Sequence, residues 1–210
     1  MFVVSTPQHL AWISENIDET LYFTNGDYDV DEQNIYLLND INLTSICDNW
    51  LPIGREDITV TKFKCTFYGN GHTITFNIKK DDNWENMGLI ATVGKDAKVQ
   101  DLNVVCNISS ENDYVGGICG ENYGTIQNCS VTGSIKGTNS QVGGIVGRNY
   151  EYGKILDCRV DATVEGDDEY VGGIAARNDY QCEIKNCRVS GTIRSSAVWV
   201  GGIAGCPLAP

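Results

Sequence analysis

The side chains with the most reactive chemistry in this sequence are its nine cysteines. Three of them follow one another at intervals of 29 residues: Cys129, Cys158 and Cys187. Cysteines can form disulfides or bind zinc, but nine is an odd number, and a single C-x4-C pair, Cys182 with Cys187, is a weak zinc signal. We therefore predict neither a metal site nor a cofactor, and interpret the recurring cysteines as buried thiols that pack like small apolar side chains. If a disulfide forms, we expect it between Cys47 and Cys65.

Acidic side chains are the second group that could do chemistry, and they gather in expected turns. The segment DYDVDE (27–32) has alternate carboxylates that resemble the start of a calcium loop. It lacks the following glycine and the distal glutamate of an EF-hand, so we interpret it as a solvated loop. The other acidic clusters fall at 111–113 and 167–169.

The sequence shows no catalytic set. It contains no H-E-x-x-H motif and no serine or cysteine nucleophile motif, and its two histidines suggest no triad. We therefore predict that the chain is not an enzyme. The alternative is a carbohydrate-active β-helix enzyme, a lyase or a glycoside hydrolase, which would need a carboxylate pair about 5–10 Å apart in a groove.

These residues recur because the chain repeats itself. A VGG motif begins at Val115, Val142, Val171 and Val200, at spacings of 27, 29 and 29 residues. The motif I-x-(N/D)-C-x-V, around the three recurring cysteines, keeps the same phase. Weaker copies place Met87 and Leu102 at the corresponding positions. Two motifs that hold one phase over four copies indicate a repeat architecture.

Each repeat reads as short strands joined by polar turns. From Cys129 the sequence alternates, so Cys129, Val131, Gly133 and Ile135 are expected to point inward, and Cys106 is expected at the Gly133 phase. The alternation breaks just before each cysteine, which predicts a bend at three residues: Asn128, Asp157 and Asn186. One unit cannot bury its own apolar face, but parallel stacking at about 4.8 Å per layer can. We predict an all-β fold, a right-handed parallel β-helix (β-solenoid) with about 28 residues per coil.

Stacked coils place like residues above one another. Asn122, Asn149 and Asn178 are expected to form a ladder of hydrogen-bonded amides. Position 136 and its copies carry Lys136, Glu165 and Arg194, so opposite charges alternate on an outer face. The glycines of VGG permit a tight corner or close packing where a Cβ atom would intrude.

Aromatic residues flank the VGG strands and form our predicted binding surface. Exposed aromatic rings beside Asn and Asp can stack on sugars or contact a protein. The alternative is that they are turn residues that pack on their neighbours. The seven residues are Tyr114, Tyr123, Tyr150, Tyr152, Tyr170, Tyr180 and Trp199.

The first part of the chain differs from the repeats. We predict an N-terminal cap over 1–33 with a short helix, in which Thr6 is the cap, Pro7 fits the first turn, and the side chains of Leu10, Ile13 and Ile17 share one face. The solenoid is expected over 34–210, regular from about residue 87, within a single structural domain. No second cap is visible at the C-terminal CPLAP. We expect that the natural protein continues, that this tail covers the end, or that the end takes part in end-to-end or edge association.

Composition excludes several classes of protein. The 210 residues include 15 Lys and Arg against 28 Asp and Glu, a net charge of −13. Such a chain is not expected to bind nucleic acid through a basic surface. No apolar run is long enough for a transmembrane helix, and MFVVSTPQHL lacks the features of a signal peptide. We therefore expect no membrane insertion, and a mature form or a fragment.

The combination of motifs resembles the GLUG-repeat proteins. The resemblance covers roughly residues 5–205 through NDINL, WLPIG, GNGHTITFNI, MGLIA and the regularly spaced VGGI and I-x-(N/D)-C-x-V segments. It extends to β-helical regions of bacterial surface proteins, including the region beside some immunoglobulin A1 peptidases. Cys65 stands where these proteins often have glycine, and their metallopeptidase activity does not carry over.

The resemblance implies an exported bacterial protein, usually a segment of a longer one. We expect a non-catalytic β-solenoid module with an adhesion or spacer role, located at the cell surface or secreted, whose partner is a host or bacterial surface glycan or protein. A weaker alternative is an acidic solenoid that mimics DNA, although basic residues interrupt its acidic rows.

Overall fold

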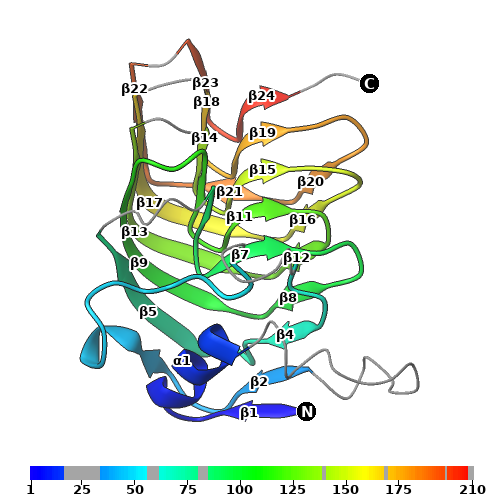
Figure 1. Ribbon diagram of the computed structural model, residues 1–210. Coiled ribbons are helices and arrows are strands. Elements are labelled where there is room, and N and C mark those ends of the chain that lie inside the picture. Colours follow the sequence, from blue (N-terminus) through cyan, green and yellow to red (C-terminus); the bar gives the residue numbers. More distant parts are fainter. Residues whose placement is uncertain are drawn as a thin grey trace.

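The computed structural model describes residues 1–16, 34–55, 62–79, 85–138, 141–167, 170–196 and 198–207. The chain winds into a parallel β-solenoid of about six turns with about 29 residues per turn, and one short helix lies at its N-terminal end (Figure 1). The all-β solenoid predicted from the repeats is therefore confirmed. All of its strand pairs between coils are parallel among the described residues.

The strands form four sheets, A to D, and sheets A and B contain seven strands each. Sheet A has the order β1 (Phe2–Val4), β2 (Ile35–Leu37), β4 (Thr66–Tyr68), β8 (Lys98–Gln100), β12 (Thr125–Gln127), β16 (Lys154–Leu156) and β20 (Glu183–Lys185). Sheet B has the order β3 (Ile41–Asn42), β5 (Thr73–Ile78), β9 (Asn103–Ser110), β13 (Ser130–Gly137), β17 (Arg159–Gly166) and β21 (Arg188–Val189), and β22 (Thr192–Ser195) also pairs with β17.

The other two sheets contain the VGG motifs. Sheet D has the order β6 (Asn86–Met87), β10 (Tyr114–Gly116), β14 (Gln141–Gly143), β18 (Tyr170–Gly172) and β23 (Trp199–Gly201). Sheet C has the order β7 (Ile90–Val93), β11 (Cys119–Asn122), β15 (Val146–Asn149), β19 (Ala175–Asn178) and β24 (Ala204–Pro207). The valines of the four VGG copies pair directly, so the sequence spacing corresponds to the register.

The bend between sheets A and B lies where the broken alternation predicted it. Asn128, Asp157 and Asn186 have φ angles of 52°, 56° and 55°, which turn the chain between the two strands of each coil. Asn and Asp adopt this left-handed conformation more readily than other residues with a side chain. The bend therefore repeats on successive coils because the same residue types occupy it.

Sheets C and D approach each other closely through glycine. A Cβ atom on Gly116 would lie 2.3 Å from the carbonyl oxygen of Cys119, and one on Gly120 would lie 2.6 Å from the Cα atom of Asn86. Real Cβ atoms do not tolerate such distances from backbone atoms, so only glycine fits here. The glycines of the motif thus permit the close packing that the sequence suggested.

Gly133 corrects one detail of the predicted alternation. It pairs with Cys106 as expected, but Gly133 is exposed and has a φ of +112°, whereas Cys106 is buried. Without a side chain, Gly133 contributes nothing to the core, and its backbone departs from the extended strand conformation. The inward assignment of Gly133 is therefore wrong, while Cys129, Val131 and Ile135 are buried as predicted.

The helix α1 (Pro7–Asn16) lies at the N-terminal end of the solenoid (Figure 1). The hydroxyl oxygen of Thr6 accepts a hydrogen bond from the backbone N–H of His9 at 3.4 Å, and Leu10 and Ile13 are buried. A short 3-10 helix, η2 (Leu43–Ser45), follows β3. Ile17 and the predicted cap boundary at 33 lie outside the described residues, so the domain division stays a prediction.

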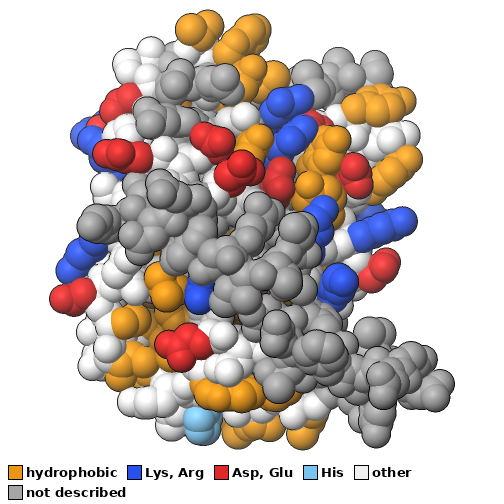
Figure 2. Space-filling view, viewed as in Figure 1, with side chains coloured by type: hydrophobic (Ala, Val, Ile, Leu, Met, Phe, Trp, Pro, Cys, Tyr) orange, Lys and Arg blue, Asp and Glu red, His pale blue; other side chains and the backbone are white. Residues whose placement is uncertain are grey.

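The opposite end of the solenoid exposes apolar side chains. Val198 and Trp199 are 87% and 54% exposed, and Val200 and Ile203 are also exposed. In Figure 2, hydrophobic side chains gather at the top, over the end that β22, β23 and β24 form in Figure 1. The expected end-to-end association stays a prediction, although this surface has the apolar character that it would need.

Candidate functional site

The cysteine ladder is buried in the interior coils and carries no disulfide. Cys129 and Cys158 are buried, Cys187 is half-buried, and all nine cysteines are free. Cys47 and Cys65, the pair named as the first candidate if a disulfide forms, are both free, and the Cys47 thiol donates a hydrogen bond to the carbonyl oxygen of Leu43.

Burial makes the interior thiols poor nucleophiles at neutral pH. Desolvation alone raises the pKa of Cys106 to about 12. The neighbouring thiol of Cys129, followed by burial, raises the pKa of Cys158 to about 12. Since the thiolate is the reactive form, these residues act as packing groups at pH 7.

The asparagine ladder runs through the interior beside sheet C. The side-chain amide of Asn122 donates to the Oδ1 atom of Asn149 at 2.8 Å, and Asn149 donates to the Oδ1 atom of Asn178 at the same distance. Asn122 and Asn149 are fully buried, and their amides also donate to the backbone carbonyls of Gly124 and Gly153. The ladder therefore satisfies polar groups at the corner where sheet C ends.

Three of the seven predicted aromatic residues surround one arginine, Arg148. Its guanidinium carbon lies 3.9 Å from the centre of the Tyr150 ring and 6.0 Å from that of Tyr114. The rings of Tyr123 and Tyr150 meet edge to face with centres 5.4 Å apart, and the Nζ atom of Lys62 lies 3.3 Å from the centre of the Tyr123 ring. We call these residues, with Glu121, Arg177 and Asp179, the aromatic–arginine cluster.

Two carboxylates neutralise the arginines of this cluster. Arg148 donates to Asp179 through Nε at 2.9 Å and Nη2 at 2.7 Å, and its Nη1 atom lies 3.6 Å from Glu121. Arg177 donates to the other oxygen of Asp179, whose side chain is only 5% exposed. Burial by itself would lower the pKa of Arg148, but its contacts with Asp179 raise the value above the ordinary one. A buried charge pair with several hydrogen bonds positions side chains firmly.

The tyrosines of the cluster are half-buried. Burial is the largest cause that raises the pKa of Tyr114, and burial followed by Glu121 raises that of Tyr123. The hydroxyl of Tyr123 donates to the Oε2 atom of Glu121 at 3.3 Å. For Tyr114, Tyr123 and Tyr150, these contacts support the alternative that the aromatic residues pack on their neighbours.

The remaining four aromatic residues do not join the cluster. Tyr170 and Trp199 are paired in register on β18 and β23, and Gln141 separates Tyr170 from Tyr114 in the same sheet. Tyr152 and Tyr180 are 59% and 54% exposed in the turns after β15 and β19. The predicted row is thus divided into one packed cluster, the register pair of half-buried Tyr170 and exposed Trp199, and the two exposed turn residues Tyr152 and Tyr180. Figure 2 shows basic, acidic and hydrophobic side chains intermixed on the side where Figure 1 places sheet C.

Sequence reasoning missed Arg148, Glu121 and Asp179. Glu121, Arg148 and Arg177 occupy one register position on β11, β15 and β19, between an apolar or glycine residue and a ladder asparagine. Charged residues inside an otherwise buried strand require partners, and this pattern could have suggested an ion-pair network. Asp179 follows Asn178 where tyrosine follows the two earlier ladder asparagines, a second signal of the same site.

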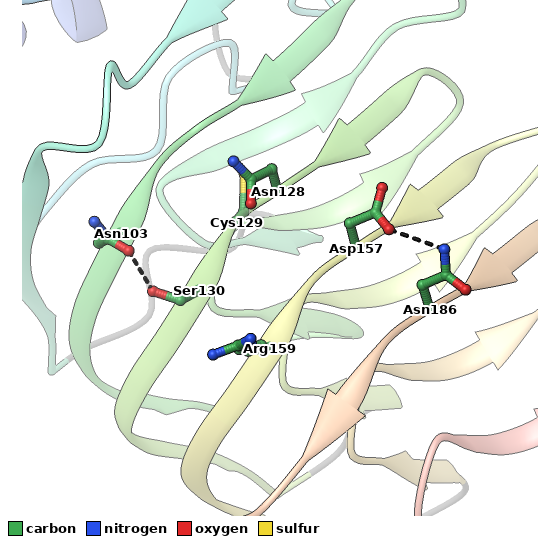
Figure 3. Close-up of a pocket in the computed structure, with 7 residues that line it drawn as sticks. All are labelled: Asn103, Asn128, Cys129, Ser130, Asp157, Arg159 and Asn186. Carbon is green, nitrogen blue, oxygen red and sulfur yellow. Dashed lines mark hydrogen bonds between the residues drawn. The ribbon is translucent and has the colours of Figure 1, made fainter.

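A polar hollow of about 580 Å³ lies on the outside of the bend between sheets A and B (Figure 3). The seven residues that line it come from successive coils: Asn103, Asn128, Cys129, Ser130, Asp157, Arg159 and Asn186. In this hollow the hydroxyl of Ser130 donates to the Oδ1 atom of Asn103 at 2.6 Å, and the amide of Asn186 donates to the Oδ1 atom of Asp157 at 3.0 Å (Figure 3). The stacked bends thus supply amide and carboxylate groups along one edge.

A second hollow of about 270 Å³ continues the first along sheet B. It shares Ser130 and Arg159 with the first hollow. Its other lining residues are Val131, Thr132, Asp161, Arg188 and Ser190. We call the two hollows together the polar groove. The alternation in the sequence predicts that Ser130, Thr132 and their copies lie on one outer face of sheet B. The hollows in this face arise from the bend and from the short side chains beside the arginines.

The two weak metal signals in the sequence, the C-x4-C pair and the acidic segment 27–32, are only partly covered by the described residues. Among the described residues, no three His, Cys, Asp or Glu side chains are grouped so that they could hold a metal ion. The Cys187 thiol donates to the carbonyls of Ile155 and Lys185, toward the interior. The acidic segment 27–32 and the residues 168–169 lie outside the described residues. Within the same ranges, no helix is long and apolar enough to cross a membrane.

Comparisons with known proteins agree with this repeat structure. The family model of the GLUG motif matches three times, at residues 111–136, 138–165 and 167–194. A search of curated proteins found no match. A crystal structure of a protein from Bacteroides ovatus, provisionally assigned as an immunoglobulin A1 protease, has the same fold, with a TM-score of 0.59 and 17% sequence identity over 97% of this chain and 74% of that chain.

The three GLUG matches cover three successive coils, and their boundaries follow the register that the strands display. The weaker copies before residue 111 continue the same sheets. The chain therefore contains three GLUG repeats within residues 111–194, and they stack as successive coils of one β-solenoid.

Proposed function

We propose that this chain is a non-catalytic β-solenoid module of a bacterial cell-surface or secreted protein, with an adhesion or spacer role. The observation that carries the proposal is the polar groove, a hydrogen-bonding surface that extends over successive coils of a rigid repeat scaffold. The GLUG repeats and the structural neighbour from Bacteroides ovatus support an extracellular or surface location. The partner we expect is a surface glycan or protein.

The distribution of carboxylates favours binding over catalysis. Glycoside hydrolysis needs two carboxylates with different roles about 5–10 Å apart in one groove. The polar groove is lined by two carboxylates, Asp157 in the first hollow and Asp161 in the second, and Arg159, which lies between them in the sequence, lines both hollows. The buried carboxylates of Glu121 and Asp179 are both paired with Arg148. This arrangement supports a non-catalytic role.

The DNA-mimic alternative has less support. A mimic would need carboxylates in phosphate-like rows, whereas the outward rows of sheet B combine Ser130, Arg159 and Arg188 with Thr132 and Asp161. Basic groups inside these rows would repel the basic surface of a DNA-binding protein. We therefore do not favour this function.

The proposal is tested with the whole chain on a glycan array, followed by incubation with polysaccharides and analysis of the products. Binding to glycans or to bacterial or host surfaces without any change in the length of the polysaccharide is the expected result. Release of shorter or unsaturated products would contradict the non-catalytic role and support the enzyme alternative. If the chain neither binds nor cleaves any of these ligands, only the spacer role remains.

A further inference from the structure

Arg159 and Arg188 form a pair of like charges on the outer face of sheet B. They are aligned in register on β17 and β21, so their backbones are about 4.8 Å apart. Both residues are exposed, and both line the smaller hollow of the polar groove. Like charges directly opposite each other on neighbouring strands destabilise a sheet. The fold itself therefore gains nothing from placing two arginines here.

Four other basic residues on the solenoid have acidic partners. Lys136 lies 3.4 Å from Glu165, Lys79 lies 3.7 Å from Asp48, and Arg148 and Arg177 share Asp179. Among the described residues, neither Arg159 nor Arg188 forms an ion pair. Other basic residues, such as Lys154 and Arg194, also form no ion pair among the described residues, but Arg159 and Arg188 face each other in register without a carboxylate paired to either.

The surroundings of the pair suit a ligand rich in hydroxyl groups. Amides and hydroxyls border the arginines and can donate or accept hydrogen bonds: Asn103, Asn128, Ser130, Thr132, Asn186 and Ser190. Each coil rises by about 4.8 Å, which is comparable with one sugar residue of an extended polysaccharide. A guanidinium group binds carboxylate or sulfate through two parallel hydrogen bonds.

The neighbouring carboxylates select against denser polyanions. Asp157 and Asp161 lie in the same groove as Arg159, and the whole chain is acidic. Nucleic acid carries a phosphate at every step, so it would be repelled by both. A glycan with one acidic group on some of its sugars can place its charges on the arginines and its hydroxyls on the amides.

We propose that the polar groove binds an acidic glycan, with Arg159 and Arg188 as the residues that recognise its carboxylate or sulfate groups. This inference rests on the proposed function, because it names the ligand class of the same module. It goes further in assigning the contact to sheet B and not to the aromatic residues.

The test measures binding of the whole chain to immobilised hyaluronan, which carries only carboxylates, to κ-carrageenan, which carries only sulfates on alternate sugars, and to neutral dextran. The test variant is Arg159→Gln with Arg188→Gln. The matched control is Lys154→Gln with Arg194→Gln, which removes the same charge from exposed positions outside the groove. Duplex DNA is included as a competing polyanion.

We expect the unmodified chain to prefer at least one acidic glycan over dextran, with an affinity that falls as salt rises. The test variant should bind about tenfold more weakly or worse, and the control should stay within about twofold. The acidic glycan that is bound identifies carboxylate or sulfate as the preferred group.

Equal losses in the test and control variants would show that overall charge and not the groove causes binding, and would overturn the inference. Preference for DNA, or for neutral dextran, would overturn it as well. Binding to a glycan or a cell surface that survives in the test variant would remove the inference but leave the proposed function intact, whereas polysaccharide turnover would remove the proposed function.

A stability measurement separates a ligand role from a structural one. If the two arginines held the sheet together, the test variant would unfold at a lower temperature than the unmodified chain. We expect an equal or higher unfolding temperature, because the variant removes like-charge repulsion between β17 and β21. A clearly lower temperature would contradict the assignment.

Discussion

The interior coils and the coil nearest the C-terminus carry the same motif but differ in burial. Cys158 and Val160 are fully or almost fully buried, whereas their register partners one coil later, Cys187 and Val189, are half-buried. The same contrast holds for Val164 and Ile193. Since the residue types are alike, the difference arises from the number of neighbouring coils and not from the motif.

This comparison shows where the stability of the solenoid resides. A repeat contacts only its neighbours, so an interior coil is covered on two sides and the last described coil on one. The same substitution should therefore cost much more free energy in an interior coil. Four matched pairs of variants test this, in order of decreasing expected effect.

The largest effect is expected for the glycines of the VGG motif. A Cβ atom at Gly144 would lie 2.2 Å from the carbonyl oxygen of Gly173, whereas one at Gly202 would meet nothing within 4 Å. We expect Gly144→Ala to lower the free energy of unfolding by about 4 kcal/mol or more, and Gly202→Ala to change it by about 0.5 kcal/mol or less. Urea unfolding of both variants provides the measurement, and similar losses would contradict the role of stacking.

The next effect concerns the apolar core. Ile155 is fully buried and its register partner Ile184 is only partly buried. We expect Ile155→Ala to cost about 3 kcal/mol of unfolding free energy, because it leaves a cavity that neighbouring coils cannot fill. Ile184→Ala should cost about 1 kcal/mol, since water already reaches part of this side chain. Urea titrations compare the two, and an equal cost would mean that the end coil is as well packed as the interior.

The asparagine ladder gives a smaller difference. Asn149 accepts from Asn122 and donates to Asn178 and to the carbonyl of Gly153, whereas Asn178 lies at the end of the ladder. We expect Asn149→Ala to cost about 2 kcal/mol, because it leaves buried polar groups unpaired, and Asn178→Ala to cost about 1 kcal/mol. Thermal unfolding and amide hydrogen exchange around Gly124 and Gly153 measure the effect. A larger loss in Asn178→Ala would reverse the comparison.

The smallest effect concerns pH. Burial raises the pKa of Cys106 from 9.0 to about 12, so the folded state favours the neutral thiol. The contribution of this thiol to stability is complete below pH 9 and is lost as pH rises toward 12, by about 1.4 kcal/mol per pH unit. Between pH 8 and pH 10 the unmodified chain should lose free energy of unfolding. The Cys106→Ala variant should lose about 1.4 kcal/mol less over the same interval, because it lacks this thiol.

The matched control for this experiment is Cys206→Ala, because Cys206 lies in the last coil and is partly exposed. Its stability should change between pH 8 and pH 10 as that of the unmodified chain does. Urea unfolding at the two pH values gives the numbers. If Cys106→Ala and Cys206→Ala respond alike, the interior thiol is not the group that senses the alkaline change.

The sequence predicted the repeat features well because each depends on a local pattern. The 29-residue spacing of Cys129 and Cys158, the bend at Asn128 and the pairing of Val142 with Val171 all follow from positions that one can count. The ladder of Asn122, Asn149 and Asn178 follows from the same register. Parallel stacking is the way in which such a unit can bury its apolar face, so the pattern leads to the fold.

The sequence predicted the candidate sites less well because they depend on positions that are not equivalent between repeats. Arg148 meets Asp179, which stands where earlier repeats have tyrosine, and the predicted aromatic row divides around this contact. Cys47 and Cys65, the first candidates for a disulfide, lie in the irregular first part and are both free. The prediction that Gly133 points inward was wrong because its backbone departs from the strand conformation.

The sequence by itself thus determined the period, the parallel register and the residue types that stack above one another. The tertiary structure alone decided which of the equivalent side chains are buried, which charges meet, and that Arg159 and Arg188 line a polar groove without an ion pair to any described residue. The physical reason is the range of the interactions. Period and strand alternation are properties of neighbouring residues along the chain, whereas burial and ion pairing depend on side chains that face each other from different coils and on how many coils lie on either side.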